Sequence, residues 1–191
     1  MTRTGLFFGS FNPIHNGHLA LAKHLLQCGL DEIWLVVSPQ NPLKKSADLW
    51  DDDFRLQLTR LALRNEPQLQ VSDIEFALPK PNYTIDTLRT LQQRYPDRTF
   101  VLLIGADNAA IFDRWKDYDA ILNTFDVWAY PRDGYPNANP QLPQIRFVDA
   151  PLFRVSSTEI RQRLAAGQTI RGRVPDCVAD VIEQRLKNAN N

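Results

Sequence analysis

The sequence predicts an α/β fold in which a parallel β-sheet carries helices on both faces. Short apolar runs alternate with amphipathic segments along most of the chain, which is typical of strands joined by helices. The length of 191 residues, with 43% hydrophobic and 23% charged residues, is that of an ordinary globular protein. We therefore expect one domain over residues 1–191, with a helical C-terminal part from about residue 157.

Apolar runs bounded by turn residues are predicted to form the strands of the sheet. The fourth of them is the strongest buried strand, and the third contains an alternating portion. In chain order the strands are Thr4 to Phe8, Glu32 to Ser38, Leu69 to Phe76, Thr99 to Gly105 and Asp126 to Tyr130, with Ile145 to Val148 as a short last strand.

Segments with apolar residues at three- and four-residue spacing are predicted to form the helices. Acidic residues open the second helix, where they suit the helix dipole, and Gly167 and Pro175 separate the last two. The Pro-, Asn- and Gly-rich stretch Pro131 to Pro143 is predicted to be a loop. The helices are Leu19 to Cys28, Asp51 to Leu63, Thr84 to Tyr95, Trp115 to Leu122, Thr158 to Ala166 and Pro175 to Lys187.

This alternation favours a Rossmann-like, doubly wound sheet with strand order 3-2-1-4-5, followed by C-terminal helices. In that order the first and fourth strands are central neighbours. Ligands of such sheets bind beyond the carboxyl ends of the strands, where the winding reverses. We therefore expect the segments 9–18 and 105–107 to meet at one crevice.

Composition excludes several classes of protein. The formal net charge is zero, which disfavours a broad nucleic-acid or acidic-membrane surface but not a local basic pocket. No apolar run reaches the roughly 18 residues of a membrane span, and the N-terminal run is too short for a signal peptide. Two isolated cysteines, Cys28 and Cys177, fit a reducing compartment. We expect a cytoplasmic protein without nucleic-acid or membrane partners; the sequence leaves a homo-oligomer open.

The first chemical signal is the run GSFNPIHNGH at residues 9–18, between a strand and a helix. Gly9 allows close backbone approach to a ligand, and the helix start offers an anion site. If the first helical turn starts between His15 and His18, both imidazoles can donate to one phosphate. Each histidine alone can instead be a helix cap or a satisfied core residue. A zinc site is disfavoured because there is no HExxH, and His24 has no evident carboxylate partner.

The second signal is SSTEIR at residues 156–161, directly before a predicted helix. Its hydroxyl residues can simply cap that helix, with Ser157 or Thr158 as the cap. Arg161 lies in the first turn, so its guanidinium can bind the same anion as the free N–H groups through two parallel hydrogen bonds. Each of the two signals predicts a phosphate site.

These two runs resemble the HxGH and ISSTxIR signatures of the nucleotidyltransferase superfamily. Three further stretches narrow the resemblance to nicotinate-nucleotide adenylyltransferases. KPNYTIDTL at 80–88 resembles the YTxDTL segment of that family, and GADN at 105–108, followed by Phe112, Trp115 and Lys116, resembles its G-x-D…F…W segment. SPQNPLK at 38–44 matches the loop after the second strand, although the family often has a histidine where Leu43 stands.

The resemblance implies a reaction of ATP with nicotinate mononucleotide that yields deamido-NAD and pyrophosphate. The substrate phosphate attacks the α-phosphorus of ATP in line. Because that phosphate is already ionised at neutral pH, no general base is needed, and catalysis is mainly positioning and charge stabilisation. Mg²⁺ is expected as the cofactor, held mainly by ATP phosphates and water rather than by a protein metal site.

The resemblance also implies the roles of individual residues. The expected catalytic residues are His18, as first choice for the transition state, with His15, Arg161 and Lys44. The nicotinate end is expected at Asn41, Tyr83, Thr84 and Trp115. The ATP end is expected at Gly9, Ser10, Phe11, His15, His18, Gly105, Asp107, Ser156, Ser157 and Arg161.

Simpler roles stay open for several of these residues. Trp115 can be ordinary core, Asp107 and Thr84 can cap helices, and Lys44 can be solvated. The rival functions are adenylylation of nicotinamide mononucleotide, which differs from the nicotinate compound by a few atoms, and non-catalytic nucleotide binding by a regulator. Pantetheine-phosphate adenylyltransferases are a weaker rival, since they carry threonine where His15 stands.

Overall fold

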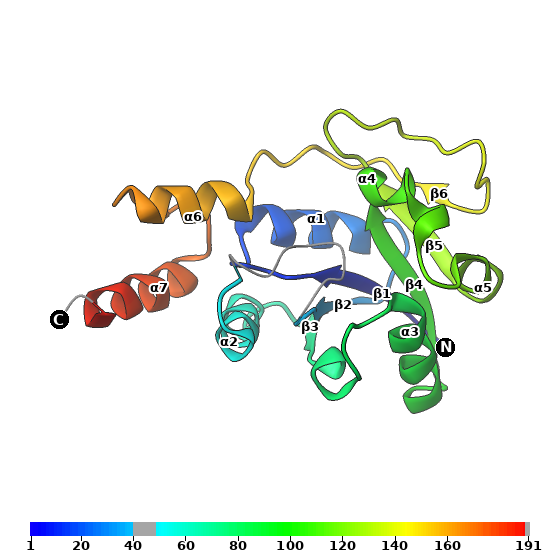
Figure 1. The fold of residues 1–191 in the computed structure, drawn as a ribbon, viewed down its shortest axis with the longest axis horizontal. Coiled ribbons are helices and arrows are strands. Elements are labelled where there is room, and N and C mark those ends of the chain that lie inside the picture. Colours follow the sequence, from blue (N-terminus) through cyan, green and yellow to red (C-terminus); the bar gives the residue numbers. More distant parts are fainter. Residues whose placement is uncertain (40–48, 190–191) are drawn as a thin grey trace.

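The computed structural model describes residues 1–39 and 49–189, and within them six strands form one parallel sheet (Figure 1). The order is β3-β2-β1-β4-β5-β6, so the predicted order of the first five strands is confirmed and β6 extends it. The predicted α/β class is also confirmed. The strands are β1 (Thr2–Gly9), β2 (Glu32–Val37), β3 (Leu69–Ser72), β4 (Arg98–Gly105), β5 (Asp126–Tyr130) and β6 (Arg146–Phe147).

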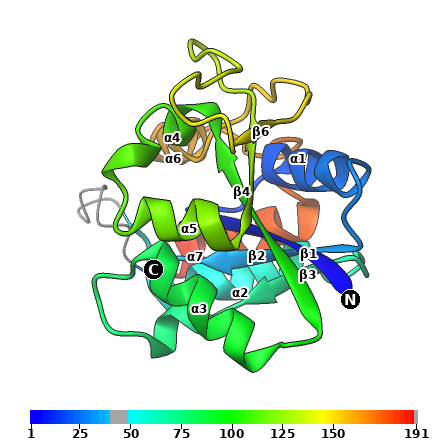
Figure 2. The same ribbon diagram turned by 90° about the vertical axis from the view of Figure 1, so that its right-hand side faces the viewer.

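Helices follow the strands and cover both faces of the sheet, with α1 and α3 on opposite sides of the strands (Figure 2). The α-helices are α1 (Asn16–Leu26), α2 (Asp52–Ala62), α3 (Thr84–Arg94), α4 (Ala106–Ala109), α5 (Tyr118–Thr124), α6 (Ser157–Ala165) and α7 (Asp176–Ala189). Two short 3₁₀ turns, η2 (Ile74–Ala77) and η3 (Phe112–Arg114), add to them.

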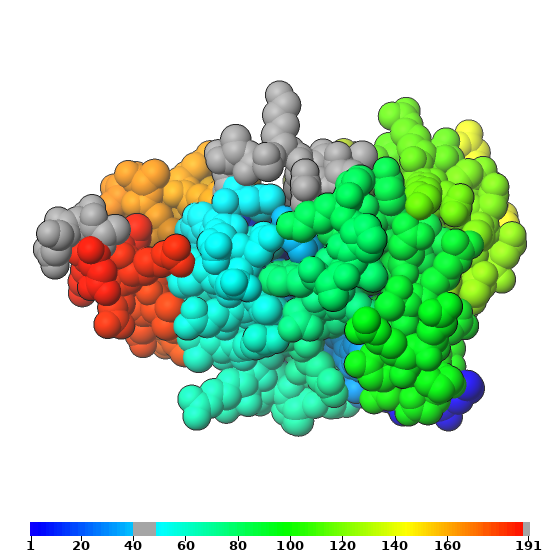
Figure 3. All heavy atoms as spheres, turned by 60° about the horizontal axis from the view of Figure 1, so that its bottom comes forward, coloured from blue at the N-terminus to red at the C-terminus, as the bar shows by residue number. Residues whose placement is uncertain are grey.

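The core forms two layers because alternate residues of each strand point to opposite faces. On one face Phe7, Leu35 and Leu103 pack beneath α1, and this layer continues into α2, α6 and α7. On the other face Leu6 and Leu102 pack beneath α3 and α5. Helix α7 contacts α2 at one end of the molecule, where Figure 3 shows the red C-terminal segment against the cyan one.

The strand register places the two glycine-bearing strand ends together. Phe7 of β1 pairs with Leu103 of β4, so Gly9 and Gly105, each two residues further on, end neighbouring strands side by side. The winding reverses between these strands, because β2 follows β1 on one side and β4 lies on the other. The crevice predicted from the sequence is therefore present at this edge of the sheet.

Two predicted elements differ from the structure. The third strand was predicted to reach Phe76, but it ends at Ser72, whose partner Val36 is next to the last residue of β2. The helix predicted from Trp115 to Leu122 begins only at Tyr118, because Asp117 takes a left-handed conformation with φ 51°. After Ser72 the chain enters η2, whose Glu75 bonds to Thr87 of α3, and Asp117 pairs with Arg89 of α3 at 3.8 Å; periodicity does not reveal such contacts.

One buried guanidinium connects the loops at the carboxyl ends of β1 and β2. Arg55 of α2 is fully buried and donates to the backbone carbonyl of Ser10, and to the Ser38 and Trp50 carbonyls at 3.0 and 3.1 Å. It also donates to the Pro39 carbonyl at 3.3 Å and pairs with Asp52 at 2.5 Å. These bonds satisfy carbonyls that have no sheet partner and fix the loops that leave both strands.

We predict that Arg55→Met lowers the free energy of unfolding by on the order of 3 kcal/mol, because several buried carbonyls lose their donor. Urea unfolding followed by circular dichroism measures the loss. The matched control is Arg60→Met on the same helix, which removes an exposed ion pair to Asp73 and should cost less than about 1 kcal/mol. Equal losses in the two variants would contradict the prediction.

Candidate active site

A cavity of about 1310 Å³ opens at the carboxyl ends of the central strands. Every predicted site residue that the structure describes lines it. Asn41 and Lys44 lie outside the described residues. The lining residues that were predicted are Gly9, Ser10, Phe11, His15, His18, Tyr83, Thr84, Gly105, Asp107, Trp115, Ser156, Ser157 and Arg161.

The two histidines cap the helix that they open. Helix α1 starts at Asn16, so the first turn does begin between them, as the phosphate hypothesis required. His15 Nδ1 accepts from the His18 backbone N–H at 3.2 Å, and His18 Nδ1 accepts from the His15 N–H at 3.3 Å. The rings stack with centroids 3.5 Å apart. Because each Nδ1 accepts a hydrogen bond, each ring carries its proton on Nε2. The stacked rings therefore present two Nε2–H donors side by side.

The environment of His15 keeps it uncharged. Its side chain is only 5% exposed, and burial, followed by the charge of Arg132, lowers the pKa of His15 to about 4. At neutral pH this imidazole therefore donates as a neutral N–H group. His15 therefore supplies a hydrogen-bond donor to the site without adding a positive charge.

Helix α6 brings the second signature against the first. Ser156 caps the helix by accepting from the Glu159 N–H at 3.1 Å, so the cap is one residue before the two positions predicted. Ser157 Oγ donates to the Pro13 carbonyl at 3.0 Å, and Arg161 donates to the Asn12 carbonyl at 2.8 Å. Two side chains thus tie residues far apart in the sequence into one wall of the cavity.

An ion pair lies beside the end of β4. Arg132 Nε is 3.4 Å from Asp107 Oδ1, too poorly aligned for a hydrogen bond, and Arg132 also lies over the Tyr130 ring at 5.4 Å from its centre. A Cβ at Gly105 would lie 2.2 Å from the Asp107 carboxylate and 2.8 Å from Arg132. Only glycine therefore leaves both side chains where they are.

A further part of the cavity lining comes from the start of α3 and from Trp115, which follows η3. Tyr83 is the N-cap of α3 without a side-chain capping bond, so Thr84 is not the cap. Trp115 is partly buried against Phe112, with ring centres 4.9 Å apart, and its indole N–H has no partner among the described residues. It therefore both contributes to the core and lines the cavity.

A buried carboxyl group supports the start of α3. Glu75 of η2 is 3% exposed and accepts from Thr87 of α3 at 2.9 Å, while its backbone carbonyl accepts from Asn82 at 3.0 Å. Burial raises the pKa of Glu75, and hydrogen bonds from Ser38 and Thr87 oppose that shift. The carboxyl group thus joins the end of β2 to the first turn of α3.

Comparisons with known proteins agree with the geometry. The family described as cytidylyltransferase-like matches residues 6–163. A Bacteroides fragilis (strain YCH46) protein named "probable nicotinate-nucleotide adenylyltransferase" is 52% identical over 172 residues, covering 89% of this chain and 86% of that protein. A Cytophaga hutchinsonii protein of the same name is 42% identical over 190 residues, covering 98% and 99%. The chain belongs to the cytidylyltransferase-like family, among its nicotinate-nucleotide adenylyltransferases.

Solved structures share the fold of this cytidylyltransferase-like chain. A Plasmodium falciparum nicotinic acid mononucleotide adenylyltransferase complexed with NaAD matches with a TM-score of 0.77 at 19% identity, over 97% of this chain and 96% of that one. The same Plasmodium enzyme complexed with APC matches with a TM-score of 0.76 at 18% identity, over 98% of both chains. The family resemblance predicted from the motifs is confirmed.

Several lining residues of this cytidylyltransferase-like site escaped the sequence analysis. Arg132 lies two residues after the end of β5 at Tyr130, so the rule that placed 105–107 at a strand end could have found it. Glu75 and Asn82 gave no signal, because their importance depends on contacts with other segments. The basic residues that line the cavity in the described part of the chain are Arg114, Lys116, Arg132, Arg154 and Arg161.

We predict that stability falls as the pH drops from about 6.5 to about 4, by up to about 3 kcal/mol, because of His15. Its pKa in the folded state is the lower one, about 4, so the unfolded chain takes up a proton that the folded chain refuses. His15→Asn keeps a good capping residue but removes this titration, so the variant should lose less. Urea unfolding at about pH 7 and about pH 5 measures the loss of unfolding free energy in the wild type and in the variant. Equal losses in the two proteins would contradict the prediction.

Proposed function

We propose that the chain transfers the adenylyl group of ATP to nicotinate mononucleotide, giving deamido-NAD and pyrophosphate. The observation that carries this proposal is the meeting of the histidine run and the SSTEIR run in one cavity, which Tyr83 and Trp115 also line. The names of relatives 40–52% identical to the chain support the nicotinate substrate rather than the nicotinamide or non-catalytic alternatives.

The charge distribution suits two polyanionic substrates. The chain has zero net charge, yet its described cavity lining carries five arginine and lysine side chains against three carboxyl groups. Such a pocket attracts phosphates without making the whole surface basic. The three carboxyl groups are Glu75, Asp107 and Asp133.

In the proposed reaction an oxygen of the mononucleotide 5′-phosphate attacks the α-phosphorus of ATP. A new phosphorus–oxygen bond forms while the bond to the bridging oxygen breaks, and pyrophosphate leaves with that electron pair. Nε2–H groups of His15 and His18 donate to phosphate oxygens as charge develops, with His18 as the main contact at the transition state. Ser156, Ser157 and Arg161 hold the triphosphate from the side of α6.

The remaining roles divide between the two ends of the cavity. Backbone groups of Gly9, Ser10 and Phe11 lie along ATP, and Gly105 and Asp107 meet its ribose. Trp115 stacks on the pyridine ring, while Tyr83 and Thr84 donate to the carboxylate. Asn41 and Lys44, outside the described residues, stay predictions for the pyridine and phosphate groups.

Magnesium is proposed to enter with ATP. Within residues 1–39 and 49–189, no three His, Cys, Asp or Glu side chains gather so that they could hold a metal ion. The residues therefore fit an ion carried by phosphate oxygens and water, where it would neutralise charge on the triphosphate.

No helix in the described part of the chain is long and apolar enough to cross a membrane. We propose a cytoplasmic enzyme that needs no nucleic acid, and a homo-oligomer stays open.

The function is tested by pyrophosphate release from Mg-ATP with three acceptors in separate reactions. We expect release with nicotinate mononucleotide and much less with nicotinamide mononucleotide or phosphopantetheine, since donors aimed at a carboxylate are left unpaired by an amide. Preferential use of either other acceptor would assign a different substrate. No release with any acceptor would refute an adenylyltransferase.

We predict that His18→Ala lowers kcat by on the order of 10²–10³-fold, the usual effect of removing a donor to a developing charge. Steady-state pyrophosphate assays measure it, and a thermal melt checks that the variant is folded. His24→Ala is the matched control, since His24 lies on the same helix but outside the cavity lining and contacts the Asp149 carbonyl. Near-normal turnover by folded His18→Ala would remove this residue from the mechanism.

A further inference from the structure

Two separate segments form the end of the cavity assigned above to the pyridine ring. Tyr83 and Thr84 belong to the start of α3, whereas Trp115 follows η3, after β4. No strand pairing joins these segments in the described sheet, so their spacing depends on side-chain contacts. A pyridine ring that stacks on Trp115 and is bound by Tyr83 and Thr84 needs a fixed distance between the two segments.

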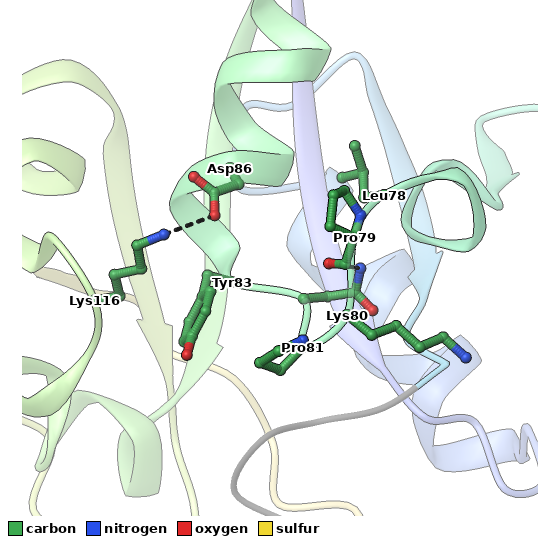
Figure 4. Close-up of a pocket in the computed structure, with 8 residues that line it drawn as sticks. Leu78, Pro79, Lys80, Pro81, Tyr83, Asp86 and Lys116 are labelled. Carbon is green, nitrogen blue, oxygen red and sulfur yellow. Dashed lines mark hydrogen bonds and ion pairs between the residues drawn. The ribbon is translucent and has the colours of Figure 1, made fainter.

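Lys116 makes the bridge between them. Its ammonium group lies 3.0 Å from Asp86 Oδ2, in the first turn of α3, and 4.5 Å from the centre of the Tyr83 ring. Figure 4 shows the Lys116 side chain reaching across to Asp86 with the Tyr83 ring beside the pair. The next residue, Asp117, approaches Arg89 of α3 at the longer distance of 3.8 Å. The shorter contacts thus converge on Lys116, the neighbour of Trp115.

The position of this bridge sets it apart from an ordinary surface ion pair. Lys116 and Tyr83 line both the large cavity and an adjoining cavity of about 280 Å³, which Asp86 also lines. An ammonium group over an aromatic face is held in direction as well as distance, because the ring attracts it from one side and the carboxylate from the other. Because Trp115 is the residue before Lys116, these contacts restrain the backbone that carries Trp115 relative to Tyr83.

We infer that Lys116, Asp86 and the Tyr83 ring form a latch that sets the width of the pyridine end of the site. Lys116 is a positioning residue in this inference, and it acts on the mononucleotide through Trp115 and Tyr83. The inference rests on the proposed function. It assigns the latch to binding of the pyridine nucleotide, and leaves binding of ATP and the chemical step unaffected.

The test compares Lys116→Met, Asp86→Asn and the double variant in the pyrophosphate assay. Each single variant should raise KM for nicotinate mononucleotide about threefold to tenfold, the scale of one partly exposed ion pair with a cation–π contact. In Asp86→Asn, which keeps every basic group that lines the large cavity, KM for ATP and kcat should stay near wild type. Because both variants break one latch, the double variant should be no worse than the poorer single one.

Asp86→Asn separates the latch from a direct contact. It leaves the Lys116 charge in place, so if Lys116 binds the substrate itself, Asp86→Asn will leave KM unchanged or lower it, and the latch is refuted. Equal rises in both KM values, with a lower melting temperature, would mark a merely structural ion pair and also refute it. Arg60→Met, which breaks the distant ion pair to Asp73 at 2.7 Å, should change neither KM.

Failure of the latch and failure of the proposed function give different results. If wild-type protein releases no pyrophosphate with nicotinate mononucleotide, the function proposed above is wrong. If it does and the latch variants match it in every constant, only the latch is wrong.

Discussion

The architecture of the site depends on the convergence of backbone carbonyls around the Arg55 guanidinium. Strands β1 and β2 end side by side, and the chain leaving each of them has carbonyls that the sheet no longer pairs. Leaving such groups buried without donors is costly, and water has no access to a fully buried guanidinium. A planar group with five donors that stays charged at every physiological pH meets this need, and a lysine could not do so with the same geometry. The position of Ser10, and hence the path of the histidine run, follows from it.

Structural and chemical roles coincide in the histidine pair. The capping role that the sequence left open is present, since each ring accepts from the other's backbone N–H. That role does not compete with phosphate binding, because an accepting Nδ1 fixes the proton on Nε2. At α6, too, residues that line the cavity have a structural role: Ser157 and Arg161 hold the helix against the loop by donating to the Pro13 and Asn12 carbonyls. The same contacts therefore stabilise the starts of α1 and α6 and align the donors that face the cavity.

Charge in the cavity is supplied by residues from several segments that the fold assembles. His15 is kept neutral by burial and by Arg132, so the site gains directional donors there without a further positive charge. The arginines and Lys116 carry the charge, and two of them are restrained by carboxylates, Asp107 and Asp86. These ion pairs orient the cations, and the cavity lining still carries more basic than acidic groups. Such a lining attracts polyanionic substrates.

The sequence by itself determined the strand order, the crevice beside Gly9 and Gly105, and the two polyphosphate signatures. The strands and helices follow from periodicity and capping preferences, which are local properties; the order and the crevice follow from the common arrangement of doubly wound sheets, and the polyphosphate roles from the resemblance of two short motifs. Tertiary structure alone decided the end of β3 at Ser72, the partners of Glu75, and the contacts of Arg132 and Lys116. Each of those is an interaction between side chains from segments distant in sequence. Its energy depends on burial and on a partner that exists only once the sheet has brought the segments together.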